Sequence, residues 1–377
     1  MKHPAAKRNF GHIDIPLQRV HIELTNICEF DCVFCPKERM KRKPGRMDAA
    51  LAKRLISEVG AESIADKVTF HVMGEPTLHP DLFEILAHAE NEGVQVGLTT
   101  NGRSLGGEAG RKLLEFGLHQ IDVSLQTPDE KSFALRKAKG ITFEEYMGGI
   151  LDFFTAYRKR WPLSRFKFRF LNTTRKPSSL KDSIGDLQVM ASSDELRSTF
   201  GKWAAIIYDR LGADENSRTE AMKGISRLVW WKWNVIEVYP GVFFETYILS
   251  DWGHAFEGGG DIKPAWAGHC FGMRDHFAVL YNGDVTLCCI DFDGATAAGN
   301  VKDKTLKGVL SSPEVGKIVD GFKRMKLVHP YCKHCLGSSS LVSWALKPVI
   351  TVIGLKALKP FFYNQSSVYP PEKTSIK

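Results

Sequence analysis

Long apolar runs are missing from this sequence of 377 residues. No stretch approaches the roughly 18 uncharged apolar residues of a membrane-spanning helix. The longest candidate, residues 348–355, is bounded by Lys347 and Lys356. The first residues are basic but lack the apolar segment and small-residue cleavage site of a signal peptide. We therefore expect a cytoplasmic protein.

A strong charge imbalance is also missing. The 51 lysines and arginines outnumber the 43 acidic residues only slightly, and the net charge of +8 does not indicate nucleic acid as a partner. With 43% hydrophobic and 25% charged residues, the composition is that of a globular protein and excludes a collagen-like or low-complexity chain. The length fits one large domain and a smaller one.

Cysteine is absent from residues 36–269, and the eight cysteines lie on either side of that stretch. A chain of this length does not need disulfides for stability, and disulfides are rare in cytoplasmic proteins. Two tight cysteine groups indicate two metal sites instead. The groups are Cys28, Cys32 and Cys35, and then Cys270, Cys288, Cys289, Cys332 and Cys335.

The first half of the chain alternates predicted strands with predicted helices. Asp48 stands where a helix N-cap belongs, ahead of an amphipathic run. Such alternation indicates βαβ units and a parallel sheet, an α/β fold with its chemistry at the carboxyl ends of the strands. The expected strands are residues 18–24, 67–72, 94–99, 120–125 and 165–171, and the expected helices are 49–59, 80–91, 107–116 and 143–157.

The second half of the chain is less regular. A polar, helical stretch over residues 175–230 contains the expected helix 193–211, and residues 233–249 are expected to form a strand pair. Residues 279–288 are typical of a β-hairpin, and a helix is expected over residues 305–324.

Cys28, Cys32 and Cys35 follow the spacing C-x3-C-x2-C in a loop after the expected strand 18–24. Three thiolates from one loop can hold three irons of a 4Fe–4S cluster and leave the fourth iron open. A structural zinc site needs a fourth ligand, and no histidine follows before His71. Zinc stays open as the alternative to an iron–sulfur cluster.

This cysteine motif, preceded by Glu23-Leu24-Thr25-Asn26 and with Phe34 before its last cysteine, resembles that of the radical S-adenosylmethionine (SAM) enzymes. The resemblance covers about residues 18–175. It implies a partial (β/α)6 barrel in which SAM binds the open iron. It also implies that an electron from a flavodoxin or ferredoxin-type reductant cleaves SAM to a 5′-deoxyadenosyl radical, which takes hydrogen from the substrate.

The resemblance extends to single residues. The turn after Met73 is similar to the Gly-Gly-Glu-Pro turn that holds the SAM amino group in the family, and Phe34 and Arg136 stand where an adenine contact and a carboxylate contact are expected. Gln126-Thr127 stands where the family often has Asp-Gly. This chain therefore has no acidic residue at the position expected to contact the SAM ribose. The SAM-binding residues implied by the resemblance are Phe34, Gly74, Glu75, Pro76, Asn101, Ser124 and Arg136.

The second cysteine group, with Cys270-x12-Gly283-x4-Cys288 and Cys332-x2-Cys335, resembles the SPASM domain of radical SAM enzymes and, more closely, its shortened twitch form. It implies one auxiliary 4Fe–4S cluster held by Cys270, Cys288, Cys332 and Cys335, with Cys289 left over. A zinc ribbon built from the same four cysteines is the alternative. Four protein ligands leave no open iron, which favours electron transfer and net oxidation of the substrate.

Two further segments each have two interpretations. Residues 36–46 hold six basic residues, which either steer an anionic substrate or a reductase toward the site or form a solvated loop. Residues 341–363 are apolar with interspersed lysines and form either a helix in peripheral contact with a membrane or one docked on the protein. We favour the docked helix.

We therefore expect a radical SAM enzyme that oxidises a small-molecule or sugar-like substrate with the help of the auxiliary cluster. One alternative is modification of a ribosomal peptide or protein side chain, and another is a non-catalytic zinc protein that binds nucleic acid. The expected domains are an N-terminal extension (1–17), a radical SAM partial barrel (18–250), a twitch or SPASM-like domain (260–340) and a C-terminal tail (341–377).

Overall fold

A computed structural model describes residues 8–174, 180, 188–212, 214–249, 251–256, 261–268 and 270–356, without the side chains of residues 347 and 350–356. The chain forms two compact units. Of the described residues, unit 1 takes those within 8–29, 36–99 and 251–356, and unit 2 takes those within 30–35 and 100–249.

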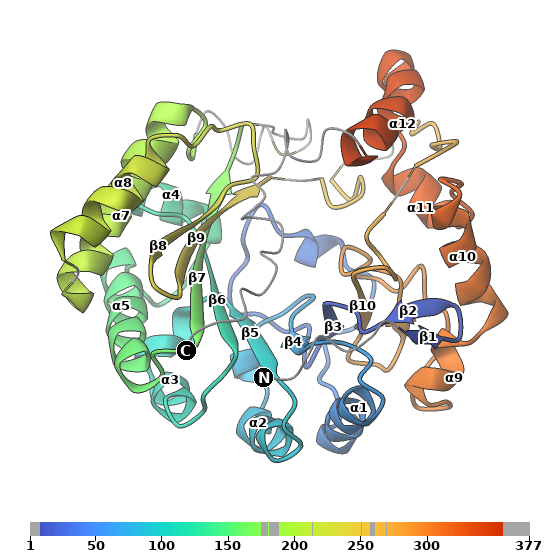
Figure 1. Ribbon diagram of the computed structural model, residues 1–377, viewed down its shortest axis with the longest axis horizontal. Helices are drawn as coiled ribbons and strands as arrows, with labels where there is room; N and C mark the ends of the chain where they lie inside the picture. The colour runs from blue at the N-terminus through green and yellow to red at the C-terminus, as the bar shows by residue number, and fades with distance from the viewer. Residues whose placement is uncertain are drawn as a thin grey trace. The chain divides into compact units, whose positions relative to one another are not determined.

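Unit 1 is built on strands in the order β11-β10-β3-β4-β5 (Figure 1). β10 and β3 are parallel neighbours, so the second cysteine region adds strands to the sheet that precedes the first cysteine group. β11 runs antiparallel to β10, while β4 and β5 continue the parallel pairing. The strands are β3 (Arg19–Ile22), β4 (Val68–Phe70), β5 (Val96–Thr100), β10 (His276–Val279) and β11 (Val285–Thr286).

Two helices, α1 (Ala49–Ala61) and α2 (Leu82–Asn91), lie together on one side of β3, β4 and β5 (Figure 1). α1 begins where the sequence predicts, because the Asp48 side chain accepts a hydrogen bond from the Leu51 backbone N–H. A hairpin of β1 (Arg8–Phe10) and β2 (Ile13–Ile15) was not predicted, since strands of three residues give almost no alternation signal.

The prediction of one continuous helix over residues 305–324 is wrong. The chain instead forms α9 (Leu306–Leu310) and α10 (Pro313–Lys323). Ser312 caps the second helix, and Pro313 has no N–H to continue the first. α11 (Pro330–Cys335) follows.

The predicted C-terminal tail begins with α12 (Leu341–Lys356), and residues 357–377 lie outside the described part. Trp344 Nε1 donates to the Pro264 carbonyl at 2.9 Å, which ties α12 to its own unit. Among the described helices, none has the length and apolar character needed to cross a membrane.

Unit 2 has strands in the order β6-β7-β9-β8, with β8 antiparallel to β9. On β7, Phe166, Phe168 and Phe170 are fully buried and face the aromatic side chains of α5 and α7. The residues between them therefore occupy the other face. The elements are β6 (Gln120–Gln126), β7 (Arg165–Asn172), β8 (Val235–Tyr239), β9 (Val242–Ile248), α3 (Glu108–Leu113), α4 (Glu130–Phe133), α5 (Phe143–Arg160), α7 (Ser193–Leu211) and α8 (Glu215–Ile225).

The predicted α/β fold is confirmed: parallel strands alternate with helices in both units. α7 has the predicted bounds, and residues 233–249 form the predicted strand pair. Residues 175–179 and 181–187 of the predicted helical stretch lie outside the described residues. The predicted domain boundaries, including the one between residues 250 and 260, stay predictions.

Candidate functional site

In unit 2, the segment from Phe30 to Cys35 is held by a buried arginine. Arg136 is only 2% exposed, and its guanidinium lies 4.8 Å from the Phe30 ring centre. Its Nη1 is 3.9 Å from Cys32 Sγ, and the Val33 N–H donates to the Leu135 carbonyl at 2.9 Å. A positive charge next to the sulfur stabilises a thiolate, the form of cysteine that binds metal.

The same arginine reaches the turn after β5. Arg136 Nη2 donates to the Asn101 carbonyl at 2.8 Å and to the Tyr146 hydroxyl at 2.6 Å. Arg136 therefore joins Cys32 to Asn101, two residues that the sequence assigns to one site. Its implied role as a SAM carboxylate contact stays a prediction.

The other predicted SAM-binding residues of unit 2 differ in exposure. Phe34 is buried, and Ser124 is half-buried on β6. Asn101 Oδ1 accepts from the Arg103 N–H at 2.8 Å, which shapes the turn. Beyond Ser124, Gln126 adopts a positive φ of 59° at an irregularity in β6, at the place where the sequence departs from the family pattern.

In unit 1, the predicted Gly74-Glu75-Pro76 turn lies against the chain that leads to Cys28. Gly74 has a φ of +74°, and a Cβ there would lie 2.3 Å from the Thr25 carbonyl oxygen. The Glu75 N–H donates to the Ile27 carbonyl at 2.8 Å, and Lys37 Nζ donates to the Cys28 carbonyl at 2.8 Å. The turn and the start of the cysteine motif are thus one packed arrangement.

Glu75 itself is buried and is oriented by its neighbour. Its Oε1 accepts from the Thr77 N–H at 3.1 Å and from the Thr77 hydroxyl at 2.7 Å. Pro76 begins a short 3-10 helix, Pro76–Leu78, where its missing N–H costs nothing.

One arginine of the basic loop 36–46 is part of an internal ion pair. Arg42 binds Glu23 through both guanidinium nitrogens, and the two side chains are 8% and 0% exposed. Arg42 Nε also donates to the Phe292 carbonyl at 2.7 Å, and Tyr281 N–H donates to Glu23 at 3.1 Å. Arg42 therefore neither steers a partner toward the site nor lies in solvent. The spacing of the basic residues in the sequence does not indicate its ion pair with Glu23.

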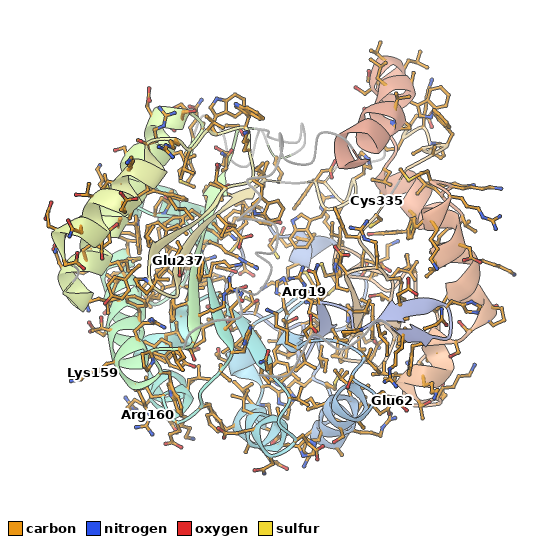
Figure 2. All side chains as sticks on the ribbon, viewed as in Figure 1. Arg19, Glu62, Lys159, Arg160, Glu237 and Cys335 are labelled. Carbon is orange, nitrogen blue, oxygen red and sulfur yellow. The ribbon has the colours of Figure 1, made fainter. Side chains whose placement is uncertain are left out.

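The four cysteines of the predicted auxiliary site come together in unit 1. Cys335 ends α11 (Figure 2), and a Cβ on Gly253 would lie 3.2 Å from its Sγ. Burial raises the pKa of Cys288 well above its usual value, and Cys270, Cys289 and Cys335 raise it further. Burial, Cys270 and Cys335 raise the pKa of Cys332 to about 12. Thiols placed in this way become thiolates when they bind a cation, and they release protons as they do so.

The four sulfurs do not lie at the spacing that a single zinc ion imposes. In the described part of the chain, the four do not supply three ligand atoms within 4.8 Å of one another. A zinc ion with Zn–S bonds of about 2.3 Å holds its sulfurs about 3.8 Å apart.

Cys289, which the sequence left unassigned, lies beside a histidine. Its Sγ is 3.8 Å from His276 Nε2. Burial lowers the pKa of His276 to about 4, with a further contribution from the charge of Arg19, so the ring is neutral near pH 7.

Unit 2 also holds a charged group that the sequence analysis missed. Arg169 on β7 lies 2.8 Å from Asp122 on β6 and 3.0 Å from Glu245 on β9, and Lys167 lies 3.0 Å from Glu245. Trp233 Nε1 donates to Glu245 at 2.9 Å. Burial raises the pKa of Glu245, but the charges of Lys167 and Arg169 outweigh it and the pKa is lowered overall.

Comparisons with known families match both cysteine regions. Residues 22–159 match the model of the Radical SAM superfamily. Residues 270–336 match the SPASM model, described as an iron-sulfur cluster-binding domain.

Curated relatives match over part of their length. The chain is 37% identical over 122 residues to a probable GTP 3',8-cyclase of Methanopyrus kandleri, covering 31% of this chain and 37% of that protein. It is 30% identical over 185 residues to a probable GTP 3',8-cyclase of Sulfurisphaera tokodaii, covering 48% and 55%. An AdoMet-dependent heme synthase of Methanosarcina barkeri is 32% identical over 129 residues, covering 34% and 36%. The matches therefore span about a third to a half of these relatives.

Solved structures support the fold. Streptococcus suis SuiB has a TM-score of 0.53 at 14% identity, covering 82% of this chain and 69% of that chain. Its S-adenosylmethionine-bound form has a TM-score of 0.51 at the same identity and coverage.

Proposed function

Because this chain belongs to the radical SAM superfamily and carries a SPASM iron–sulfur domain, we propose that it oxidises a polar small molecule by two electrons. When bound, SAM and the first cluster supply hydrogen-atom abstraction, and the auxiliary cluster supplies an acceptor for the second electron. Cys28, Cys32 and Cys35 would hold the first cluster. The auxiliary cluster would be held by Cys270, Cys288, Cys332 and Cys335. A flavodoxin or ferredoxin-type protein is the proposed reductant.

The gathering of four thiols in unit 1 carries the oxidation proposal. Cys270 and Cys335 each contribute to the raised pKa of both Cys288 and Cys332, which supports one shared cluster. Four protein ligands leave no iron open to the substrate. Such a cluster serves electron transfer rather than substrate binding.

Residues around the first cysteine motif have positioning roles in this proposal. Arg136 places a positive charge beside Cys32, and Lys37 holds the Cys28 carbonyl. The buried Glu75 is fixed by Thr77, so its carboxylate is oriented before SAM binds. Preorganised polar groups of this kind bind a ligand without reorganisation.

The ion-paired face of unit 2 supports a polar, sugar-like substrate. On β7 the phenylalanines form a buried face and the cations between them form a half-buried one. Lys167 and Arg169 are already balanced by Asp122 and Glu245, so this group has no net charge. Such a face can form hydrogen bonds with hydroxyl groups, but it does not attract an anion strongly.

The experiment is an anaerobic assay of the holoenzyme with dithionite, SAM and a panel of polyols and amino sugars. We expect about eight irons per chain and formation of 5′-deoxyadenosine together with an oxidised product. Cys28→Ala should abolish both products and keep about four irons. Cys332→Ala should keep 5′-deoxyadenosine and lose the oxidised product.

Two outcomes would count against this proposal. Normal oxidation by a Cys332→Ala protein that has lost its auxiliary cluster would remove the electron-acceptor role. Turnover of peptides but of none of the polyols would favour peptide modification. The family assignment favours an enzyme, whether it oxidises a small molecule or modifies a peptide, over the alternative of a zinc protein that binds nucleic acid.

A further inference from the structure

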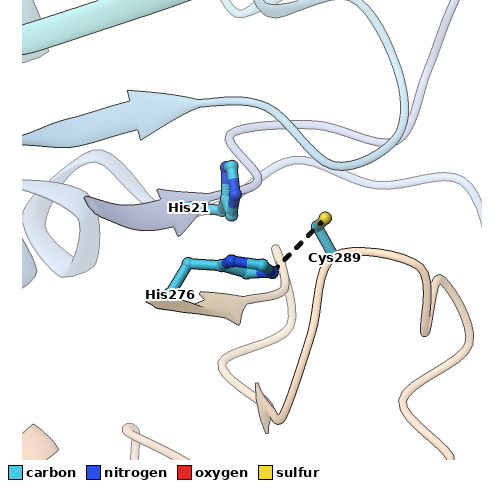
Figure 3. A group of neighbouring side chains, drawn as sticks. All are labelled: His21, His276 and Cys289. Atoms are coloured by element: carbon cyan, nitrogen blue, oxygen red, sulfur yellow. Dashed lines mark hydrogen bonds between the residues drawn. The ribbon is translucent and has the colours of Figure 1, made fainter. Parts of the chain in front are cut away.

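Three potential metal ligands meet in unit 1 apart from the two predicted iron–sulfur sites: His21, His276 and Cys289 (Figure 3). One ligand atom from each lies within 4.8 Å of the other two. Zinc bound to an imidazole nitrogen at about 2.0–2.1 Å and to a thiolate at about 2.3 Å holds the two atoms about 3.6 Å apart. The Cys289 Sγ to His276 Nε2 distance of 3.8 Å is already close to that value.

The sheet fixes the two histidines. His21 lies on β3 and His276 on the parallel neighbour β10, where His276 pairs with Arg19 and Ala278 pairs with His21. This register puts both imidazoles on one face of the sheet as diagonal neighbours. Their ring centres are 5.2 Å apart. Both ligands therefore come from rigid strands rather than from mobile loops.

Thr69 is a hydrogen-bond partner of His21. Thr69 lies opposite His21 on β4, and its Oγ1 is 2.7 Å from His21 Nδ1. In the tautomer that carries Nδ1–H, the Thr69 oxygen accepts from His21, and the Thr69 hydroxyl can donate to the Val20 carbonyl at 3.4 Å. The lone pair then resides on Nε2. A hydrogen bond to the second ring nitrogen is the usual way in which proteins orient a metal-binding histidine.

We propose that His21, His276 and Cys289 bind a single transition-metal ion of the zinc type, distinct from both iron–sulfur clusters. Two imidazoles and one thiolate favour such an ion over magnesium or calcium, which prefer oxygen ligands. Three protein ligands leave one coordination position open. Adjacent cysteines thus serve different sites, Cys288 the auxiliary cluster and Cys289 this ion.

The first test is zinc binding by the anaerobic holoenzyme, measured by elemental analysis after desalting and by X-ray absorption at the zinc edge. The absorption is element-specific, so the iron does not interfere. We expect one zinc per chain with one sulfur at about 2.3 Å and two nitrogens at about 2.0–2.1 Å. Failure to retain zinc, or a zinc bound by four sulfurs, would overturn the proposal.

The second test uses variants. Thr69→Val keeps the side-chain shape but removes the hydrogen bond to His21, and should weaken zinc binding about 10–100-fold. Thr155→Val makes the same change on α5, where the hydroxyl donates to the Leu151 carbonyl, and should leave zinc binding unchanged. Equal affinities of Thr69→Val and the parent protein would contradict the site.

Cys289→Ser separates the ion from the auxiliary cluster. It should lose the zinc and keep about eight irons per chain. Loss of iron with retention of zinc would show that Cys289 is a cluster ligand instead and would overturn the proposal. Because Thr69→Val changes neither a ligand nor the packing volume, the two variants together distinguish a lost ligand from a misfolded protein.

Discussion

The guanidinium of Arg42 and the carboxylate of Glu23 form a two-point ion pair, with Nη1–Oε2 at 2.6 Å and Nη2–Oε1 at 2.8 Å. Glu23 also accepts from the backbone N–H groups of Met73 and Tyr281. One buried pair therefore connects the basic loop, the turn before Gly74 and the second cysteine region. All of these residues belong to unit 1.

Replacing Arg42 with alanine should lower the free energy of unfolding by about 3–5 kcal/mol, because Glu23 stays buried without its cation. Denaturant unfolding of the anaerobic holoenzyme measures the change. Arg39→Ala removes an exposed cation from the same loop and should cost less than about 0.5 kcal/mol. If both variants had the same small effect, the loop would be a solvated segment after all.

Gly74→Ala should damage SAM binding as well as stability. Both Gly74 and Gly93 have positive φ angles, which cost alanine about 1–2 kcal/mol. A Cβ at Gly93 meets nothing within 4 Å, whereas one at Gly74 would overlap the Thr25 carbonyl and Asn26. We therefore expect Gly74→Ala to be less stable than Gly93→Ala and to bind SAM weakly in equilibrium dialysis. Equal melting temperatures and normal SAM binding would contradict this reading of the turn.

Local signals in the sequence predicted much of the fold. Asp48 marks a helix start because its cap is made three residues away, at Leu51. The break before Pro313 also has a local signal, Ser312 followed by proline, which the prediction of a single helix did not use.

Long-range pairings had no such signal. The contact between Glu23 and Tyr281 joins residues that are 258 positions apart, and β10 pairs with β3 across a similar separation. A strand pattern shows that a segment is extended but not which strand becomes its neighbour. For the same reason, the cysteine spacing predicted the ligands of two clusters but not the meeting of Cys289 with His276.

Arg136→Gln should lower the reduction potential of the first cluster, because the reduced cluster carries more negative charge and loses a nearby cation. The loss of charge-assisted hydrogen bonds should also cost about 1.5–3 kcal/mol of stability. A redox titration followed by electron paramagnetic resonance measures the potential. Arg136→Lys should restore part of it.

Arg103→Gln is the matched control. The Arg103 guanidinium lies 5.8 Å from the same Phe30 ring and donates to the Lys139 carbonyl at 2.8 Å. We expect the potential of this variant to match that of the parent protein. An unchanged potential in Arg136→Gln together with weaker SAM binding would support the carboxylate contact that the family resemblance implies.

Glu245→Gln should destabilise the protein at neutral pH and make no difference in acid. The cations Lys167 and Arg169 lower the pKa of Glu245 in the folded state against the effect of burial. A lowered folded pKa means that the carboxylate contributes stability above its unfolded pKa of about 4.3, and that this contribution is lost as the pH falls through the folded pKa. At pH 7 the variant should lose about 1–3 kcal/mol, because the half-buried Lys167 loses the carboxylate of Glu245 while Arg169 keeps Asp122.

Denaturant midpoints of Glu245→Gln and the parent protein, measured from pH 7 down to about pH 3, check this expectation. The difference between the two proteins removes any acid effect that they share, including acid loss of the clusters. It should be largest near pH 7 and shrink below about pH 4.3. Glu144→Gln, which changes an exposed glutamate on α5, should show no difference at any pH. A Glu245→Gln difference that is independent of pH would mean that the amide disturbs packing rather than removing a charge.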